Sequence, residues 1–233
     1  MAWRNLWRHK RRTWLTVGAM IFSNLILVFA ISLQFGSYQM MIDNTLTAYT
    51  GHLQIQRDGY NDEPKMRSSI EGIIPLANSV RKHLDSNHIA ARGVAFAMTS
   101  SEERSYGLQL IGVEPEFEVN VSSLPGLIKQ GQYFSDSNAA EIVIGSVLAR
   151  NLRVNIGDEL TLLGSGHDGE FAAGIVNVTG IFESGTADID RSMAQLPIGY
   201  FQDLFGMDGR GHNIVINGHD LSQVTLIQQD LQA

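Results

Sequence analysis

The longest run of apolar positions lies near the N-terminus of the chain. Residues 15–36 read LTVGAMIFSNLILVFAISLQFG, and no charged residue occurs between Thr13 and Ile42. At about 1.5 Å per residue, a helix of this length reaches roughly 30 Å, which is the thickness of the hydrocarbon core of a bilayer. The pattern therefore predicts a transmembrane helix over residues 15–36.

Beyond this segment the pattern alternates between the periods of strands and helices. Alternating or short apolar runs predict strands at 51–58, 90–99, 104–113, 141–144, 159–163, 171–182, 193–197 and 213–217. Helical spacing predicts helices at 75–86, 146–152, 200–205 and from Leu221 onward. Residues 183–191 are predicted to form a loop. The sequence therefore predicts the α+β class for the domain that follows the apolar helix.

The sequence pattern of this domain changes near Glu116 and returns to the earlier pattern near Thr186. Proline and glycine punctuate the stretch between these positions, whereas the residues before it read as a β-α-β-β unit. The predicted domain, residues 37–233, is therefore divided into one part made of residues 48–115 and 186–233, and a smaller β-rich part, residues 116–185, inserted between them.

Charge is distributed unevenly along the chain, which has a net charge of −7. The first twelve residues contain no acid and five bases, namely Arg4, Arg8, Lys10, Arg11 and Arg12. By the positive-inside bias, these bases keep the N-terminus in the cytoplasm and place residues 37–233 outside. Residues 1–14 are then a basic amphipathic segment on the inner leaflet. The acidic remainder lacks clustered bases on a folded face, so we expect no nucleic-acid partner.

Two interpretations of the apolar segment stay open. Ala30-Ile31-Ser32 has the small residues of a signal-peptide cleavage site. A retained helix is favoured because the apolar run begins directly behind the bases and continues past Ser32. Small or polar side chains also share one helical face, where they allow a second helix to approach closely. These helix-packing residues are Thr16, Ala19, Ser23 and Ala30. The alternative to helix packing is a monomeric anchor that happens to contain a few small residues.

Several motifs that suggest chemistry have simpler interpretations. The chain has no cysteine, which excludes disulfides, thiolate metal sites and cysteine nucleophiles. Residues 164–169 match G-x-G-x-x-G, but the segment after them reads as a strand rather than a helix, so a hairpin turn is predicted instead of a dinucleotide site. His212 and His219 bracket a predicted strand without a nearby carboxylate at ligand spacing. We expect no catalytic residue, no cofactor and no metal.

The ordered set of local patterns resembles the permease subunits of the MacB, LolC/LolE and FtsX superfamily of bacterial ABC transporters, specifically their first membrane helix and periplasmic core domain. The segments that carry the resemblance are AWRNLWRHKRRT (2–13), LIGVEP (110–115), EIVIGSVLA (141–149), LRVNIGD (152–158), VTGIF (178–182) and DIDR (188–191). Their order and spacing agree over nearly the whole chain.

The resemblance implies a permease of the bacterial inner membrane that pairs with a second permease subunit as a homodimer or heterodimer. It also implies a separate cytoplasmic ATPase and substrates in the periplasm or the outer leaflet, such as lipoproteins, with a periplasmic lipoprotein or adaptor as a further partner. A porter-like α/β part is expected at 48–115 and 186–233. Family members continue into further membrane helices, one loop of which contacts the ATPase. Since this chain ends at Ala233, we expect a truncated form, a gene fragment or a split permease.

The main hypothesis is therefore a non-catalytic permease subunit that transmits mechanical force. A stand-alone anchored domain that binds an envelope protein is the second hypothesis, and a secreted enzyme is the third. For partner recognition we nominate the predicted loop 185–191, where small residues permit movement and Asp188, Asp190 and Arg191 supply polar groups. The alternative is that Asp190 and Arg191 only fix this loop, or that the acids bind a cation.

Overall fold

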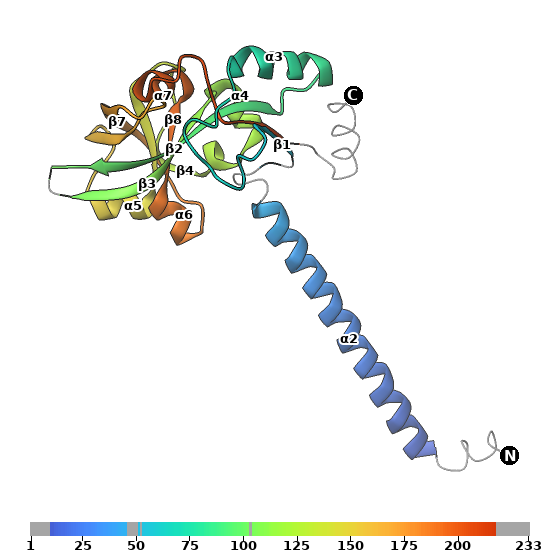
Figure 1. The fold of residues 1–233 in the computed structure, drawn as a ribbon. Helices are drawn as coiled ribbons and strands as arrows, with labels where there is room; N and C mark the ends of the chain where they lie inside the picture. Colours follow the sequence, from blue (N-terminus) through green and yellow to red (C-terminus); the bar gives the residue numbers. More distant parts are fainter. Residues whose placement is uncertain (1–9, 46–50, 52, 103, 218–233) are drawn as a thin grey trace. The chain divides into compact units, whose positions relative to one another are not determined.

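The computed structural model describes residues 10–45, 51, 53–102 and 104–217, with side chains from residue 11 to 36 in the first range. The chain divides into two compact units, residues 1–45 and 46–233. Each is described by itself. Figure 1 shows a long helix in the first unit and a mixed α/β domain in the second.

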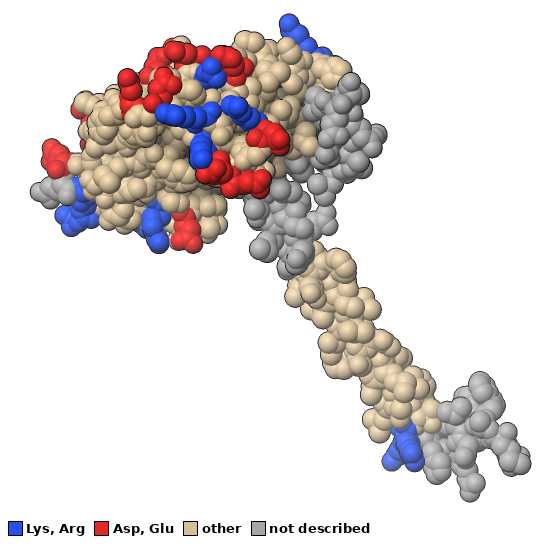
Figure 2. All heavy atoms as spheres, viewed as in Figure 1, with Lys and Arg blue, Asp and Glu red and all other residues tan. Residues whose placement is uncertain are grey.

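Helix α2 (Lys10–Thr45) extends beyond both ends of the predicted span 15–36. The segment contains no proline, which would remove a backbone hydrogen bond, so the helix can continue without a break from its basic flank to its polar flank. By length and composition, residues 11–36 are long and apolar enough to cross a membrane. Along its described side chains Figure 2 shows Lys and Arg at one end and no charge elsewhere.

The domain elements follow the predicted order closely. The helices are α3 (Ile73–Leu84), α4 (Pro115–Val121), the 3-10 helix η2 (Leu124–Leu127), α5 (Ser146–Leu152), α6 (Ala187–Ser192) and α7 (Ile198–Phe205). The strands are β1 (Leu53–Gln56), β2 (Ile89–Ser100), β3 (Ser105–Val113), β4 (Ile128–Gly131), β5 (Glu141–Gly145), β6 (Glu159–Ser165), β7 (Phe171–Phe182), β8 (Met193–Pro197) and β9 (Asn213–Ile216). The helix predicted from Leu221 lies outside the described residues.

Six strands close into a barrel. Strand β2 pairs with β3, β3 with β8, β8 with β5, β5 with β7, β7 with β6, and β6 again with β2. Each strand contributes inward-facing apolar side chains, and a barrel of this size is filled by its own side chains rather than by solvent. Buried members from the six strands are Ala97, Leu110, Leu196, Ile144, Val178 and Leu162. Helices α5 and α7 add Leu148, Leu152, Phe201 and Phe205 to the same core.

Strand β2 joins the barrel to a smaller layer. Its residues 89–92 pair with β9, and its residues 97–100 pair with β6. Strand β1 pairs with β9 at the edge of the sheet. Helix α3 covers one face of this layer through Ile73, Ala77 and Val80. The predicted β-α-β-β unit therefore exists in chain order, but β9 lies between β1 and β2 in the sheet.

One expectation differs from the structure, and some short elements were not predicted. All of helix α6 except Ser192 lies in the predicted loop 183–191, because the composition of a single helical turn does not distinguish it from a loop. Helix α4 was not predicted, although Pro115 stands in its first turn, where proline is favoured. Strand β4 has only four residues and pairs at one edge of β7. The subdivision at 116 and 186 stays a prediction, and strands from both predicted parts share the barrel.

Candidate functional site

Asp190, one of the nominated residues, belongs to α6 and is buried, with 3% of its surface exposed. Its Oδ1 accepts hydrogen bonds from the Ser184 N–H at 2.8 Å and the Ser184 hydroxyl at 2.6 Å. Its Oδ2 accepts a bond from the Ser146 hydroxyl at 3.3 Å. A side chain at Gly145 would overlap the Asp190 backbone, so this contact between α6 and β5 requires glycine. Asp190 therefore fixes the turn before α6, and its carboxylate does not face solvent.

Asp188 and Arg191 lie on the exposed side of the same helix. The Arg191 Nη1 is 3.6 Å from the Asp188 Oδ1, and the two side chains are 54% and 89% exposed. An exposed pair of this kind contributes little to stability, so both groups can exchange their partner for another at small cost. Partner recognition by Asp188 and Arg191 stays a prediction.

The helix-packing residues all lie on exposed positions of α2. The Thr16 hydroxyl donates to the Arg12 carbonyl at 2.9 Å, which satisfies this polar group within the helix itself. The packing of another membrane helix on this face of α2 stays a prediction. Among the bases that set the predicted orientation, Lys10, Arg11 and Arg12 begin the described helix, whereas Arg4 and Arg8 lie outside the described residues.

The structure brings together a serine, a histidine and an aspartate that the sequence did not connect. The Ser69 Oγ lies 3.2 Å from the His167 Nε2, and the His167 Nδ1 lies 3.1 Å from the Asp168 Oδ1. A hydrolase uses such an arrangement with an accessible nucleophile and a buried aspartate. Here Ser69 is 5% exposed and the Asp168 side chain is 82% exposed, which is the reverse. The cluster links the segment before α3 to the β6–β7 turn.

His212 anchors the same segment from inside the domain. Its Nδ1 accepts a hydrogen bond from the Val94 N–H at 2.9 Å, and its Nε2 lies 3.2 Å from the Met66 carbonyl. Nδ1 is thus the acceptor and Nε2 the donor, as in a neutral imidazole. Burial is the main cause that lowers the pKa of His212 to about 4; the hydrogen bond to the Met66 carbonyl opposes this shift, and nearby His167 contributes to it. Both ring nitrogens are occupied, which leaves none for a metal, and His219 lies outside the described residues.

Two buried ion pairs connect α4 and its preceding residue to the sheet. The Arg92 Nη2 and Nε donate to the two carboxylate oxygens of Glu118 at 2.6 and 3.0 Å, and both side chains are at most 1% exposed. Arg81 forms an ion pair with Glu114, whose Oε2 also accepts the Ala91 N–H at 2.7 Å. Burial raises the pKa of Glu114, although the Ala91 N–H and Arg81 oppose this shift. Glu114 belongs to the LIGVEP segment, and the structure gives it a role in fixing α3 to β2.

Tyr133 extends the Arg92–Glu118 pair into a network. Its hydroxyl donates to the Gln195 Oε1 at 2.9 Å, and Gln195 lies 3.5 Å from the Glu118 Oε1. Burial and then the negative charge of Glu118 raise the pKa of Tyr133 well above its usual value. Arg92, Glu118 and Gln195 are all buried, so these three side chains are not accessible to a ligand from solvent. The network supports the fold rather than chemistry on a ligand.

The G-x-G-x-x-G segment, residues 164–169, includes the end of β6 and the turn that leads to β7. The Gly166 N–H donates to the Glu170 carbonyl at 2.8 Å, and Gly169 has φ of 85°, a conformation that favours glycine. A strand and not a helix follows, so the hairpin interpretation is right and the dinucleotide interpretation is excluded.

Comparisons with known proteins agree with this architecture. The extracellular domain of the noncanonic ABC-type transporter YknZ from Gram-positive bacteria matches with a TM-score of 0.54 at 16% identity, covering 75% of this chain and 86% of that chain. The periplasmic region of MacB from Actinobacillus actinomycetemcomitans matches with a TM-score of 0.54 at 15% identity, covering 77% and 81%. At these identities the likeness shows the fold alone. No curated protein matches the sequence.

A family model confirms the resemblance read from the sequence. The model of the MacB-like periplasmic core domain matches residues 13–233, which include most of the apolar helix and the whole described part of the domain. The predicted mixed α/β class with an apolar N-terminal helix is confirmed as well. The chain therefore belongs to the MacB-like periplasmic core domain family, found in permeases of ABC-type transporters.

Proposed function

We propose that this chain is a permease subunit of an ABC-type transporter that transmits force to substrates at the outer face of a bacterial inner membrane. The observation that carries the proposal is that one family model covers both the apolar helix and the domain. The helix is long enough to anchor the chain, and Arg11 and Arg12 at its start favour a cytoplasmic N-terminus. The domain then lies outside the membrane.

The architecture is suited to carrying load. A closed barrel has no free strand edges within its ring. The buried pair of Arg92 and Glu118 fixes α4 to strand β2, which joins the barrel to the smaller layer. ATP hydrolysis is assigned to a separate cytoplasmic subunit. A second permease subunit would pack on α2 through Thr16, Ala19, Ser23 and Ala30, and the substrates would be periplasmic or outer-leaflet molecules such as lipoproteins.

Affinity purification of the tagged chain from membranes of its own host tests this assignment. We expect a P-loop ATPase and a second permease subunit to co-purify in fixed ratio, and ATP hydrolysis to accompany them. Recovery of the chain without any ATPase, at normal membrane abundance, would instead support an anchored binding domain. A matched preparation with an unrelated single-helix membrane protein carrying the same tag controls for carry-over of abundant ATPases.

A further inference from the structure

One side of the barrel exposes large apolar side chains. The outer surfaces of β2, β6 and β7 carry Phe96, Met98, Leu163, Phe171 and Ile175, which we call the apolar face. Phe96, Met98, Phe171 and Ile175 are 70%, 50%, 75% and 58% exposed. They are four of the seven large apolar side chains that are exposed in the part of the domain that the structure describes. The clustering is therefore not the usual scatter of single surface residues.

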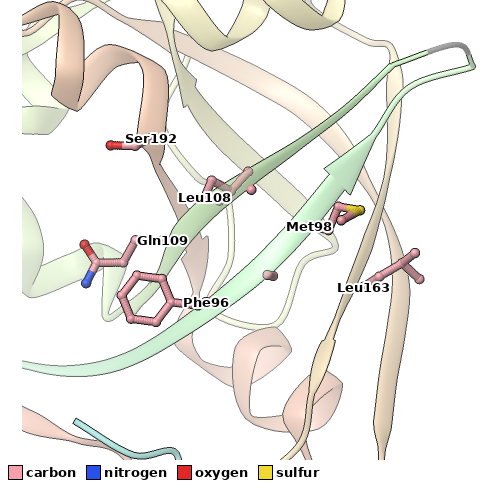
Figure 3. Close-up of a pocket in the computed structure, with 8 residues that line it drawn as sticks. Phe96, Met98, Leu108, Gln109, Leu163 and Ser192 are labelled. Carbon is pink, nitrogen blue, oxygen red and sulfur yellow. The ribbon is translucent and has the colours of Figure 1, made fainter. Parts of the chain in front are cut away.

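Strand register explains why these side chains share one side. Met98 is paired with Leu163, and Leu163 with Ala173, so the three form one row across the strands. Thr161 with Ile175, and Ser165 with Phe171, form the neighbouring rows. Phe96, Met98 and Leu163 line a hollow of about 470 Å³, to which Ser192 of α6 also contributes. Figure 3 shows Phe96 beside Gln109 and, further along the strands, Met98 and Leu163.

Packing inside the barrel keeps these residues outside. The inward positions of β2, Gly93, Ala95 and Ala97, are small, and the Phe201 ring fills the space next to Gly93. A side chain at Gly93 would overlap that ring. The alternation of strand residues then directs Phe96 and Met98 to the opposite side. Because β2 is paired on both edges, a slip that would bury them is not available.

The rows of this face contain no charged side chain. Across β3, β2, β6 and β7 the paired outward positions are Gln109, Gly107, Ser105, Phe96, Met98, Ser100, Ser165, Leu163, Thr161, Phe171, Ala173 and Ile175. An apolar centre rich in Phe and Met and depleted of charge is typical of the core of a protein–protein interface.

The end of the face near Phe171 is acidic. Phe171 borders a second hollow of about 200 Å³ that Asp168, Glu170 and Asp203 also line. Arg67 approaches this end, where its Nη2 donates to the Asp168 carbonyl at 3.1 Å. Three carboxylates against one guanidinium favour a partner that carries Lys or Arg beside its apolar residues. The same charges disfavour an anionic lipid surface and a second copy of this acidic chain.

The size of the face indicates how firmly such a partner binds. Four strands spaced about 4.8 Å apart, with three rows about 6.8 Å apart, cover roughly 400 Å² on each partner. Stable complexes bury about 1,200–2,000 Å² in total, which exceeds the roughly 800 Å² available here. The contact is therefore a transient one.

We propose that the apolar face transiently binds a segment of another protein in which apolar residues alternate with or adjoin basic ones, with the basic end over Asp168, Glu170 and Asp203. The inference rests on the proposed function only in placing the domain outside the membrane, where such a partner would meet it. The face does not include the nominated residues Asp188, Asp190 and Arg191, although Ser192 at the end of α6 lines its hollow.

The probe is a peptide of alternating leucine and lysine, called the lysine peptide. A second peptide, the glutamate peptide, has glutamate in place of each lysine. Binding is measured by fluorescence anisotropy on the full chain in nanodiscs of zwitterionic lipid, with empty nanodiscs as the blank. We expect the lysine peptide to bind and Met98→Lys to weaken it at least tenfold, because a charge then occupies the apolar centre. Val119→Lys is the matched control, since Val119 is 52% exposed but lies on α4, and we expect no change.

A charge reversal tests the acidic end separately. We expect Glu170→Lys to weaken the lysine peptide several-fold and to strengthen the glutamate peptide. Thermal unfolding of each variant checks the fold, and Phe96→Ser replaces Met98→Lys if that variant unfolds. Three results would each overturn the proposal. The first is equal weakening by Met98→Lys and Val119→Lys, and the second is equal binding of both peptides. The third is a dimer of the chain that Met98→Lys dissociates. None of these results affects co-purification with an ATPase, so the proposed function is tested independently.

Discussion

At the scale of single residues, His212 makes the stability of the domain depend on pH. Its pKa of about 4 in the folded state lies below the ordinary value of 6.5, so the unfolded chain binds more protons between these pH values. The contribution of His212 to the free energy of unfolding is therefore complete above pH 6.5. It decreases as the pH falls toward 4 and is lost below that pH, and the total loss is roughly 3 kcal/mol. Urea unfolding of the full chain in micelles at pH 7, 5.5 and 4.5 measures this loss.

A variant separates His212 from other acid-sensitive groups. His212→Asn keeps an acceptor for the Val94 N–H and has no proton to gain, so we expect a flatter dependence on pH, at some cost in stability at pH 7. His83→Asn changes an exposed histidine on α3 and serves as the control, with the wild-type dependence expected. An unchanged slope in His212→Asn would show that another group carries the effect.

The ion pair of Arg92 and Glu118 predicts a second result at this scale. Glu118→Gln leaves the buried guanidinium without a countercharge, and we expect a loss of about 3–5 kcal/mol in the free energy of unfolding. The double replacement Arg92→Met with Glu118→Leu removes both charges and should recover much of that loss. Thermal unfolding of the three proteins measures the comparison. If the single variant is as stable as the wild type, the pair does not fix α4.

At the scale of elements, α6 predicts different effects for neighbouring aspartates. Asp190→Ala leaves the Ser184 N–H and two hydroxyls without an acceptor, and we expect a loss of about 1–3 kcal/mol. Asp188→Ala and Arg191→Ala change an exposed pair, and each should alter stability by less than about 0.5 kcal/mol. Thermal unfolding measures stability, and transport by the complete permease measures recognition. Normal stability with normal transport in both exposed variants would remove α6 from the recognition hypothesis.

The packing face of α2 predicts an effect within the membrane. Ala19→Leu with Ser23→Leu adds bulk where a second helix is expected to approach closely, so association in a membrane dimerisation assay should weaken. Val17→Leu with Val28→Leu enlarges side chains on the opposite side of the helix, by one carbon each, and should leave association unchanged. The prediction requires a retained helix. Mass spectrometry of the mature protein therefore accompanies the assay, and a chain that begins near Leu33 would contradict it.

Local pattern predicted the elements well where a segment is long or strongly periodic. Helix α5 matches its predicted range of 146–152, and β7 matches 171–182, because both show clear apolar spacing. The single turn of α6 and the short β4 carry too few residues to show a period. Their structure depends on contacts distant in sequence, such as Asp190 with Ser146.

The pairing of strands that are distant in sequence could not be predicted either, because it also depends on contacts between distant residues. Nothing in β2 indicates that its first half pairs with β9 and its second half with β6. Alternation also defines two sides of a strand without showing which side is buried. In β2 the bulky Phe96 and Met98 face outward and the small Ala95 and Ala97 inward. This choice of side depends on the Phe201 ring, which packs against Gly93 from α7, a helix distant in sequence.

At the scale of the whole molecule, the described residues combine the apolar helix α2 with a domain built around a closed barrel. The family assignment explains this combination, since the MacB-like model covers both. Five bases before the helix and an acid-rich remainder favour one orientation across the membrane. Every functional proposal made for the domain depends on that orientation, because the partner, the substrate and the apolar face must meet outside the cytoplasm.

Fusion to alkaline phosphatase, which is active only outside the cytoplasm, measures the orientation directly. We predict an active enzyme when it is fused after Ala233 and an inactive one when it is fused after Arg12, with equal amounts of both fusions in the membrane. The reverse pattern would place the domain in the cytoplasm and contradict the proposed permease function.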